Sequence, residues 1–202
     1  MIRRILKVFL WGGAAVLASY FILVVARIPH AYEKQKTDAA VAKIHATKLT
    51  LDDVMGKNLP PDPGPDADKT IAGIDANQNG IRDDVELAIF KQYPASAKTR
   101  AVLLQYALAL QMEVIQPIVN SDTVGAIANE QDRAFFCVTK IVPGQGTEYK
   151  TITAIEKYNK SINAKQLNTE ARKIAHKKFY ENLKSGTTGE SNCDIDLSSL
   201  PN

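Results

Sequence analysis

Sheet-forming patterns and the common catalytic signatures are both missing from this sequence. No alternation of Val, Ile and Thr runs long enough for the strands of a sheet, and no internal repeat is present. The three histidines, His30, His45 and His176, lie far apart and form no HExxH or Cys/His cluster for zinc. Neither a GxSxG elbow nor a glycine-rich nucleotide-binding loop occurs. The sequence therefore assigns no catalytic residue.

The charge balance gives no sign of a nucleic-acid-binding surface. The chain has 25 Lys and Arg residues against 22 Asp and Glu, but four of the basic residues and none of the acidic ones lie in the first 30 positions, which leaves 21 against 22. With 202 residues, 45% of them hydrophobic and 23% charged, the chain is long enough to bury one ordinary globular core.

An uncharged hydrophobic run near the N-terminus predicts a membrane segment. Residues 8 to 26, VFLWGGAAVLASYFILVVA, are 19 residues without a charge, and a helix of that length spans roughly 28 Å, which matches a bilayer core. Three basic residues precede the run and only Arg27 follows it closely, which places the N-terminus in the cytoplasm. This predicts a single-pass protein of a bacterial inner membrane with its C-terminal domain in the periplasm or otherwise outside the cytoplasm. A signal peptide cleaved after Ala26 is the alternative and would give a secreted or periplasmic protein.

The two cysteines fit the same compartment. Cys137 lies in an apolar run, AFFCV, and Cys193 lies in a polar tail, ESNCD. Outside the cytoplasm an even, small number of cysteines is usually paired, so we expect a disulfide that fastens the tail to the body of the domain. A bond between these cysteines closes a long loop of the chain, which contributes about 4 kcal/mol to the free energy of unfolding on the chain-entropy model. One buried and one exposed free thiol is the alternative.

The rest of the chain predicts an all-α fold of about five helices. We expect residues 1–30 to be the membrane anchor or signal peptide, residues 31–70 to be a juxtamembrane helix and a Pro-rich linker, and residues 71–202 to be the helical domain. Pro29 is expected to interrupt the helix after the anchor, and Thr50 to cap a short turn over residues 50–55. The prolines of KNLPPDPGPDAD exclude a helix or a central strand there.

Apolar residues at helical spacing define the expected helices of the domain. These are residues 83–92, 96–119, 123–141, 148–162 and 169–184. The second has the broadest apolar stripe and should be the central helix, with Pro117 bending its last turn. VPGQG and Ser185-Gly186 are expected to stop the third and the last helix.

Oxygen-bearing side chains alternate along residues 75 to 86, DANQNGIRDDVE. A twelve-residue calcium loop supplies oxygens from positions 1, 3, 5, 7, 9 and 12. Those positions fall on Asp75, Asn77, Asn79, Ile81 through its carbonyl, Asp83 and Glu86. Gly80 occupies position 6, where the chain turns sharply and a β-carbon is costly. The stretch therefore predicts a site for one Ca²⁺.

These twelve residues resemble the DxDxDG class of calcium loops found in EF-hands, dockerins and thrombospondin type 3 repeats. They differ from a standard EF-hand in three ways: Arg82 stands at position 8, where a hydrophobic residue is usual, no second loop is present, and the prolines leave little room for an incoming helix. Isoleucine after the glycine and an acid at position 9 are more similar to the thrombospondin type 3 pattern. The resemblance implies one structural ion and no calcium-sensor switch. The alternative is an ordinary Asn-Gly turn followed by a capping box of Asp83 and Glu86.

Two other groups of polar residues are candidates for function. The last expected helix carries Arg172, Lys173, Lys177, Lys178 and Lys184 around His176. This is interpreted as a solvated face, with binding of anionic lipid, glycan phosphate or an acidic partner as the alternative. Gln105, Gln111 and Glu113 of the central helix are candidates to line a cleft.

The function predicted from these features is that of a membrane-anchored, extracytoplasmic, calcium-binding helical domain with a binding or structural role in the cell envelope. Ca²⁺ is the expected cofactor, and an envelope protein the expected partner besides the membrane. The alternatives are a cell-envelope enzyme of the glycan or peptidoglycan hydrolase class, and an inhibitor or immunity-type partner of an exported toxin. A deep cleft with convergent acids would favour the enzyme, and a flat apolar patch the partner-binding protein.

Overall fold

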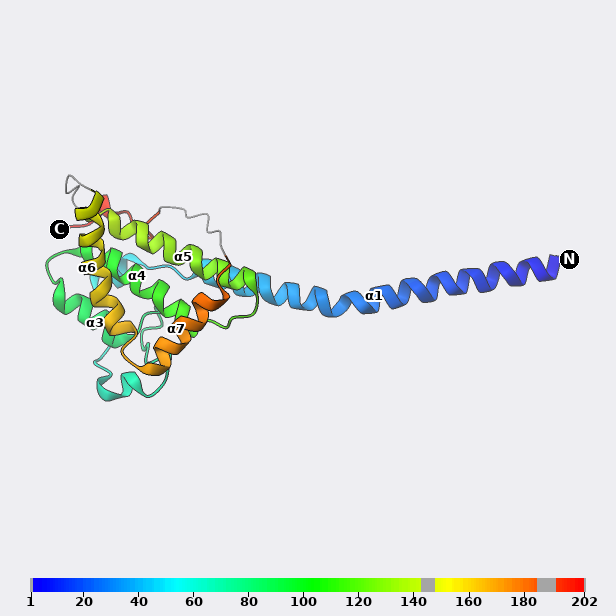
Figure 1. Cartoon of the computed structure of the whole chain (residues 1–202), viewed down its shortest axis with the longest axis horizontal. Helices are drawn as coiled ribbons and strands as arrows, with labels where there is room; N and C mark the ends of the chain where they lie inside the picture. The colour runs from blue at the N-terminus through cyan, green and yellow to red at the C-terminus, as the bar shows by residue number, and fades with distance from the viewer. Residues whose placement is uncertain (1, 143–147, 185–191, 202) are drawn as a thin grey trace. The chain divides into compact units, whose positions relative to one another are not determined.

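The computed structural model describes residues 2–142, 148–184 and 192–201, and over these residues the chain is helical with no strand, as predicted (Figure 1). The α-helices are α1 (Ile2–Ala46), α2 (Leu51–Met55), α3 (Asp83–Gln92), α4 (Ala97–Ile115), α5 (Ser121–Thr139), α6 (Glu148–Gln166) and α7 (Glu170–Asn182). Two 3₁₀ helices, η1 (Gly64–Asp68) and η2 (Leu197–Ser199), lie between α2 and α3 and near the C-terminus. The described part thus has six α-helices besides α1, against the five or so expected.

Two compact units make up the chain, Met1–Ala40 and Val41–Asn202. The first contains α1 as far as Ala40, and the last turns of α1 belong to the second unit. A stretch of α1 is long and apolar enough to cross a membrane, and none of that stretch is buried. A signal sequence has the same length and composition. Pro29 lies inside α1 and the helix continues through it, so the expected interruption is wrong. A proline in a helix removes one backbone hydrogen bond and strains the preceding turn, and a long helix can absorb that cost.

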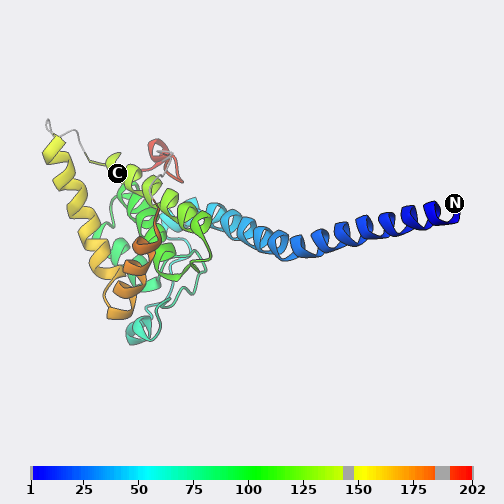
Figure 2. The ribbon, with the colours of Figure 1, turned by 45° about the vertical axis from the view of Figure 1, so that its right-hand side comes forward.

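Helix α4 is the core of the second unit. Every residue from 100 to 114 is buried, and α4 contacts α2, α3, α5, α6 and α7. In both ribbon views α5 runs alongside α4, and α6 and α7 pack across them (Figures 1 and 2). The prediction of a central helix here is confirmed, although the helix is buried on all sides and not along one stripe.

Capping residues explain where the helices begin and end. Thr50 forms a capping box with Asp53, Gly56 ends α2 in the left-handed region, and the side chains of Ser96 and Thr169 cap α4 and α7. Helix α4 ends at Ile115 with an extended Gln116, because the residue before a proline disfavours the helical conformation. Pro117 therefore follows the helix and does not bend its last turn, which corrects the expectation.

Other boundaries shift by a few residues from those expected. Helix α5 begins two residues early, at Ser121, because Asn120 accepts the amides of Asp122 and Thr123. Helix α6 extends to Gln166. The expected stop signal Ser185-Gly186 and most of VPGQG lie outside the described residues.

Candidate metal site and the buried polar clusters

The first half of the loop at residues 75 to 86 is closed by its own side chains. Asp75 accepts the amides of Asn79 (3.1 Å) and Gly80 (2.9 Å), and Oδ1 of Asn79 accepts the amide of Ile81 (2.9 Å). Gly80 has φ +86°, and a Cβ added there would lie 2.7 Å from Cδ1 of Leu108. Glycine is therefore required at this position both by backbone conformation and by space, as position 6 of a calcium loop predicts.

Three of the six predicted ligand residues converge on one point. The side-chain amides of Asn77 and Asn79 each donate to Oε2 of Glu86, both at 3.1 Å. Glu86 is only 1% exposed, and burial raises its pKa to about 7, against the opposing effect of the two amide donors. Asp53 and Asp83 lie close enough to raise it further. The Glu86 carboxylate is thus buried among neutral donors and other acids.

The other predicted ligands lie around this point with different partners. Asp83 is fully buried at the start of α3, and its carboxylate accepts the amide of Ala76 at 3.0 and 3.3 Å. Burial, the largest influence, raises the pKa of Asp83. The side chain of Ile81 is in the core, as predicted. Asp83 is the first residue of the helix and bonds back to Ala76, so the alternative of an Asp83/Glu86 capping box does not describe this helix start.

The acids of this cluster differ from most buried acids elsewhere in the domain in their lack of a basic partner among the described residues. Within the part of the chain that the structure describes, the carboxylates of Asp75, Asp83 and Glu86 form no ion pair. In the same residues, no group of three or more His, Cys, Asp or Glu side chains is arranged to hold a metal. The predicted set depends equally on two asparagines and a backbone carbonyl, whose oxygens are ordinary Ca²⁺ ligands.

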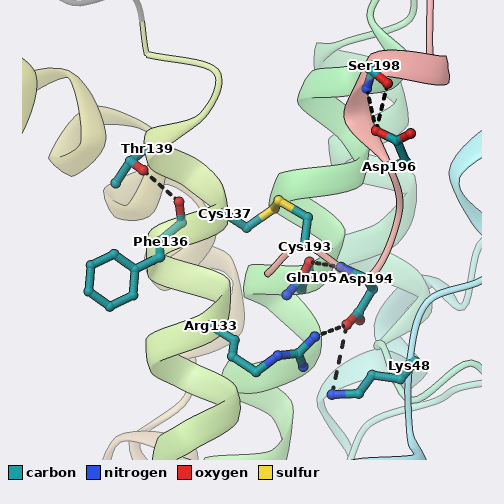
Figure 3. Close-up of a disulfide and its surroundings, with 10 residues drawn as sticks. All are labelled: Lys48, Gln105, Arg133, Phe136, Cys137, Thr139, Cys193, Asp194, Asp196 and Ser198. Carbon is teal, nitrogen blue, oxygen red and sulfur yellow. Dashed lines mark hydrogen bonds and ion pairs between the residues drawn. A yellow bond between two sulfur atoms is a disulfide. The ribbon is translucent and has the colours of Figure 1, made fainter. Parts of the chain in front are cut away.

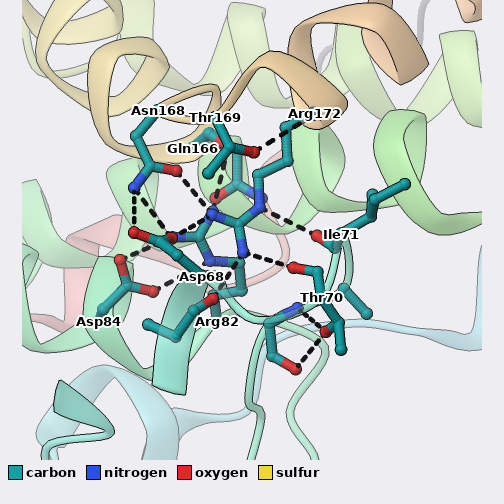
Figure 4. Close-up of polar contacts among 12 residues, drawn as sticks. Asp68, Thr70, Ile71, Arg82, Asp84, Gln166, Asn168, Thr169 and Arg172 are labelled. Carbon is teal, nitrogen blue, oxygen red and sulfur yellow. Dashed lines mark hydrogen bonds and ion pairs between the residues drawn. The ribbon is translucent and has the colours of Figure 1, made fainter. Parts of the chain in front are cut away.

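Arg82, the residue that departs from the EF-hand pattern, belongs to a separate buried cluster with Arg172 (Figure 4). Both side chains are 0% exposed. Arg82 forms a two-pronged pair with Asp84 (3.0 and 2.6 Å) and donates to the carbonyl of Gln166 (3.1 Å). The described polar contacts of the Arg82 guanidinium are thus with Asp84, Gln166 and Asp68, and none is with the three carboxylates predicted as calcium ligands.

Arg172 holds the segment before the loop. Its guanidinium donates to the carbonyls of Ala67 (2.6 Å), Thr70 (2.9 Å) and Ile71 (3.0 Å), and to the carboxylate of Asp68 (2.5 Å). The hydrogen bond from Arg172 is the main reason that the pKa of Asp68 lies below its usual range. The expectation that Arg172 shares the solvated basic face of α7 is wrong, because it is a buried structural residue. Nothing in the local sequence distinguishes it from its lysine neighbours.

The polar residues of α4 are buried, and one of them, Glu113, lines a pocket of about 400 Å³ between the end of α4 and α7. Gln105 accepts the amide of Asp194 (2.9 Å), and Gln111 donates to the carbonyl of Ala72 (2.8 Å). Oε2 of Glu113 lies 3.1 Å from Nε2 of His176, which is outside hydrogen-bonding geometry. Burial raises the pKa of Glu113, partly offset by His176. These side chains fasten neighbouring segments to the central helix.

Cys137 and Cys193 form a disulfide with a Cα–Cα distance of 5.1 Å, as predicted (Figure 3). The bond joins α5 to the C-terminal segment.

Comparison of the chain with protein-family models, with curated proteins and with solved structures gives no match.

Proposed function

We propose that this protein is an extracytoplasmic, calcium-binding helical domain held at the outer face of a bacterial inner membrane by α1. The apolar stretch of α1 and the disulfide support this proposal, because disulfides persist in oxidising compartments. Cleavage after Ala26 would release the same domain into the periplasm. The role best supported is binding or structural, with an envelope protein as partner.

The convergence of Asn77 and Asn79 on the buried carboxylate of Glu86 is the observation that supports the calcium site. Burying a carboxylate among neutral groups costs several kcal/mol unless a positive charge accompanies it. A rotation of each carboxamide by 180° exchanges its nitrogen for its oxygen, which is the atom that Ca²⁺ prefers. Asp75, Asp83 and the carbonyl of Ile81 would supply the remaining ligands.

The charge of the loop indicates a weak site. Three carboxylates and two neutral amides predict a Kd of about 10⁻⁵ to 10⁻³ M, the range of extracellular structural calcium sites. Calcium that binds the folded chain and not the unfolded chain stabilises it by about 2.7 kcal/mol at 100 times the Kd. Mg²⁺ should stabilise less, because its small octahedral shell fits such a loop poorly.

Calorimetry and thermal unfolding of the full chain in detergent test the proposal. We expect saturating calcium to raise the unfolding midpoint by roughly 5 to 11 °C relative to chelator, at about 2 to 4 °C per kcal/mol. Glu86→Gln and Asp75→Ala should abolish this shift. Glu170→Gln, which removes an exposed carboxylate in the first turn of α7, should keep it.

Two results would contradict the calcium site. The first is equal midpoints with calcium and with chelator, together with no heat of binding at millimolar calcium. The second is an equal calcium shift in wild type and in both loop variants. The first result would mean that the loop is only a turn ahead of α3. The second would mean that calcium binds at another place in the protein.

A further inference from the structure

Asp194, next to the disulfide cysteine Cys193, joins three parts of the compact unit (Figure 3). Its amide donates to Oε1 of Gln105 in α4 at 2.9 Å. Its carboxylate accepts Nη2 of Arg133 in α5 at 2.7 Å and the amide of Leu49 at 3.2 Å. The side chain of Asp194 is only 2% exposed. One residue thus connects the C-terminal segment, the core helices and the segment that follows α1.

A second acid extends this network to the end of α1. Glu130 of α5 accepts Nζ of Lys48 at 2.5 Å and pairs with Arg133, and it lies 2.7 Å from Nδ1 of His45. Lys48 also lies 3.8 Å from Asp194. Residues 45 to 49 are therefore held on the body of the domain by two buried carboxylates.

The two cysteines of the disulfide differ in their exposure to solvent. Cys137 is fully buried in α5, whereas Cys193 is partly exposed and lines a pocket of about 570 Å³. Lys98 and Lys140 also line this pocket, and the one carboxylate among the described lining residues is that of Asp196. Asp196 is engaged with the amide and hydroxyl of Ser198. Cys193 thus shares the pocket with two cationic side chains, whose charge favours the entry of a thiolate.

We propose that Cys193 is a thiol–disulfide exchange site for small thiols, and that opening its bond to Cys137 loosens the contact through which Asp194 holds the amide of Leu49. The attacking thiolate bonds to Sγ of Cys193 while the Cys137–Cys193 bond breaks, and Sγ of Cys137 leaves as a thiolate that takes a proton from water. The thiolate of a second small thiol then attacks the sulfur of the first small thiol, which is bonded to Cys193 in the mixed disulfide. Cys193 is released as a thiolate that takes up a proton, the small thiols lose two electrons as their disulfide, and the protein gains them.

Loss of the disulfide weakens the hold of Asp194 because the covalent bond fixes its neighbour. Without it, Asp194 keeps its ion pair with Arg133, its hydrogen bonds and the packing of residues such as Leu200, which is buried, but loses the covalent anchor one residue away. The amide of Leu49 donates to Asp194, so exposure of that amide reports directly on the loosening of this contact. The device depends on the oxidation state of the protein and is independent of the calcium site.

The experiment uses the full chain in detergent, treated with reduced glutathione, quenched by alkylation and mapped by mass spectrometry. We expect the mixed disulfide on Cys193 and none on Cys137. Hydrogen exchange on the fully reduced protein should then be at least tenfold faster at the amides of Leu49 and Asp194, with little change in the middle of α4. Asp194→Ala with the disulfide intact should accelerate the Leu49 amide in the same way without any thiol.

Three outcomes would overturn the proposal. These are no glutathione adduct under conditions that reduce an exposed reference disulfide, an adduct on Cys137, or an unchanged Leu49 amide after full reduction. The Cys137→Ala/Cys193→Ala variant is the control, since glutathione should change nothing in it. If that variant fails to fold, Asp194→Ala still decides whether Asp194 protects the Leu49 amide.

Discussion

Replacing Arg172 with alanine should destabilise the domain more than any single change on the surface of α7. The change removes a fully buried guanidinium and leaves the carbonyls of Ala67, Thr70 and Ile71 without their donor. Asp68 is 47% exposed, so its lost ion pair adds little. Unpartnered buried polar groups cost about 1 to 3 kcal/mol each where water cannot replace the donor. With partial replacement by water, we expect a loss of about 3 kcal/mol in the free energy of unfolding.

The assay is thermal unfolding of the full chain followed by circular dichroism. A loss of about 3 kcal/mol lowers the midpoint by roughly 6 to 12 °C in a chain of this size. Arg172→Lys should recover little, because an ammonium cannot reproduce the planar fork. Lys173→Ala is the matched control. The Lys173 side chain is 57% exposed and pairs with Glu170 on the surface, so a change under about 0.5 kcal/mol in the free energy of unfolding is expected.

The pH dependence gives a second measure of the same contact. The hydrogen bond from Arg172 holds the pKa of Asp68 below its usual range, so the contribution of this carboxylate is present above the unfolded-state pKa of about 3.9 and is lost as the pH falls through the folded-state value. The difference in unfolding midpoint between wild type and Arg172→Ala should therefore become smaller at acidic pH. A midpoint for Arg172→Ala within about 2 °C of wild type at neutral pH would refute the structural role assigned to this residue.

Three further predictions follow from single features of the chain. Gly80→Ala should lower the free energy of unfolding, measured in urea, by about 1 to 3 kcal/mol, because residue 80 has a positive φ and an added Cβ would meet Leu108. Gly125→Ala, in α5 with open space around it, is the control and should be neutral or stabilising by up to about 1 kcal/mol. Equal effects of the two changes would contradict the turn geometry. Burial raises the pKa of Glu113, so the contribution of this carboxyl to stability is full below the unfolded-state pKa of about 4.3 and is lost as the pH rises through the folded-state value. In thermal melts from pH 4 to 8, the unfolding midpoint should therefore fall less in Glu113→Gln than in wild type. Parallel curves for the two proteins would argue against a buried carboxyl. The full chain should fractionate with membranes and retain its N-terminal residues by intact mass, and recovery of only a soluble form beginning near Arg27 would contradict the anchor.

Helix positions could be predicted from the sequence because their signals are local. Hydrophobic period and caps such as Thr50, Ser96 and Thr169 place most helix starts within a residue or two of those observed. The turn at Gly80 was equally predictable, since Asn-Gly and the Asp75 side chain act over five residues. Local signals do not say which side of a buried helix a charge faces, and the three carbonyls to which Arg172 donates lie 101 to 105 residues away.

The candidate site shows the same division between local and distant contacts. Its oxygen-bearing side chains sit at the spacing that the sequence predicts, and Asn77, Asn79 and Glu86 come together. Asp83 instead accepts the amide of Ala76 within the same loop. Asn77 also donates to the carbonyl of Asn58, which lies 19 residues earlier. Sequence spacing therefore predicts which residues can reach a common point, but the final orientation of each carboxylate depends on its other hydrogen bonds.

Two buried polar side chains of the helices, Gln111 and Arg172, have one physical task in common. Residues 56 to 82 form only one short 3₁₀ helix, so most of their backbone carbonyls need donors from elsewhere. Gln111 of α4 donates to Ala72, and Arg172 of α7 donates to three carbonyls between residues 67 and 71. These contacts fix the chain immediately before Asp75. The position of the twelve-residue loop is therefore set by residues that its own sequence motif does not contain.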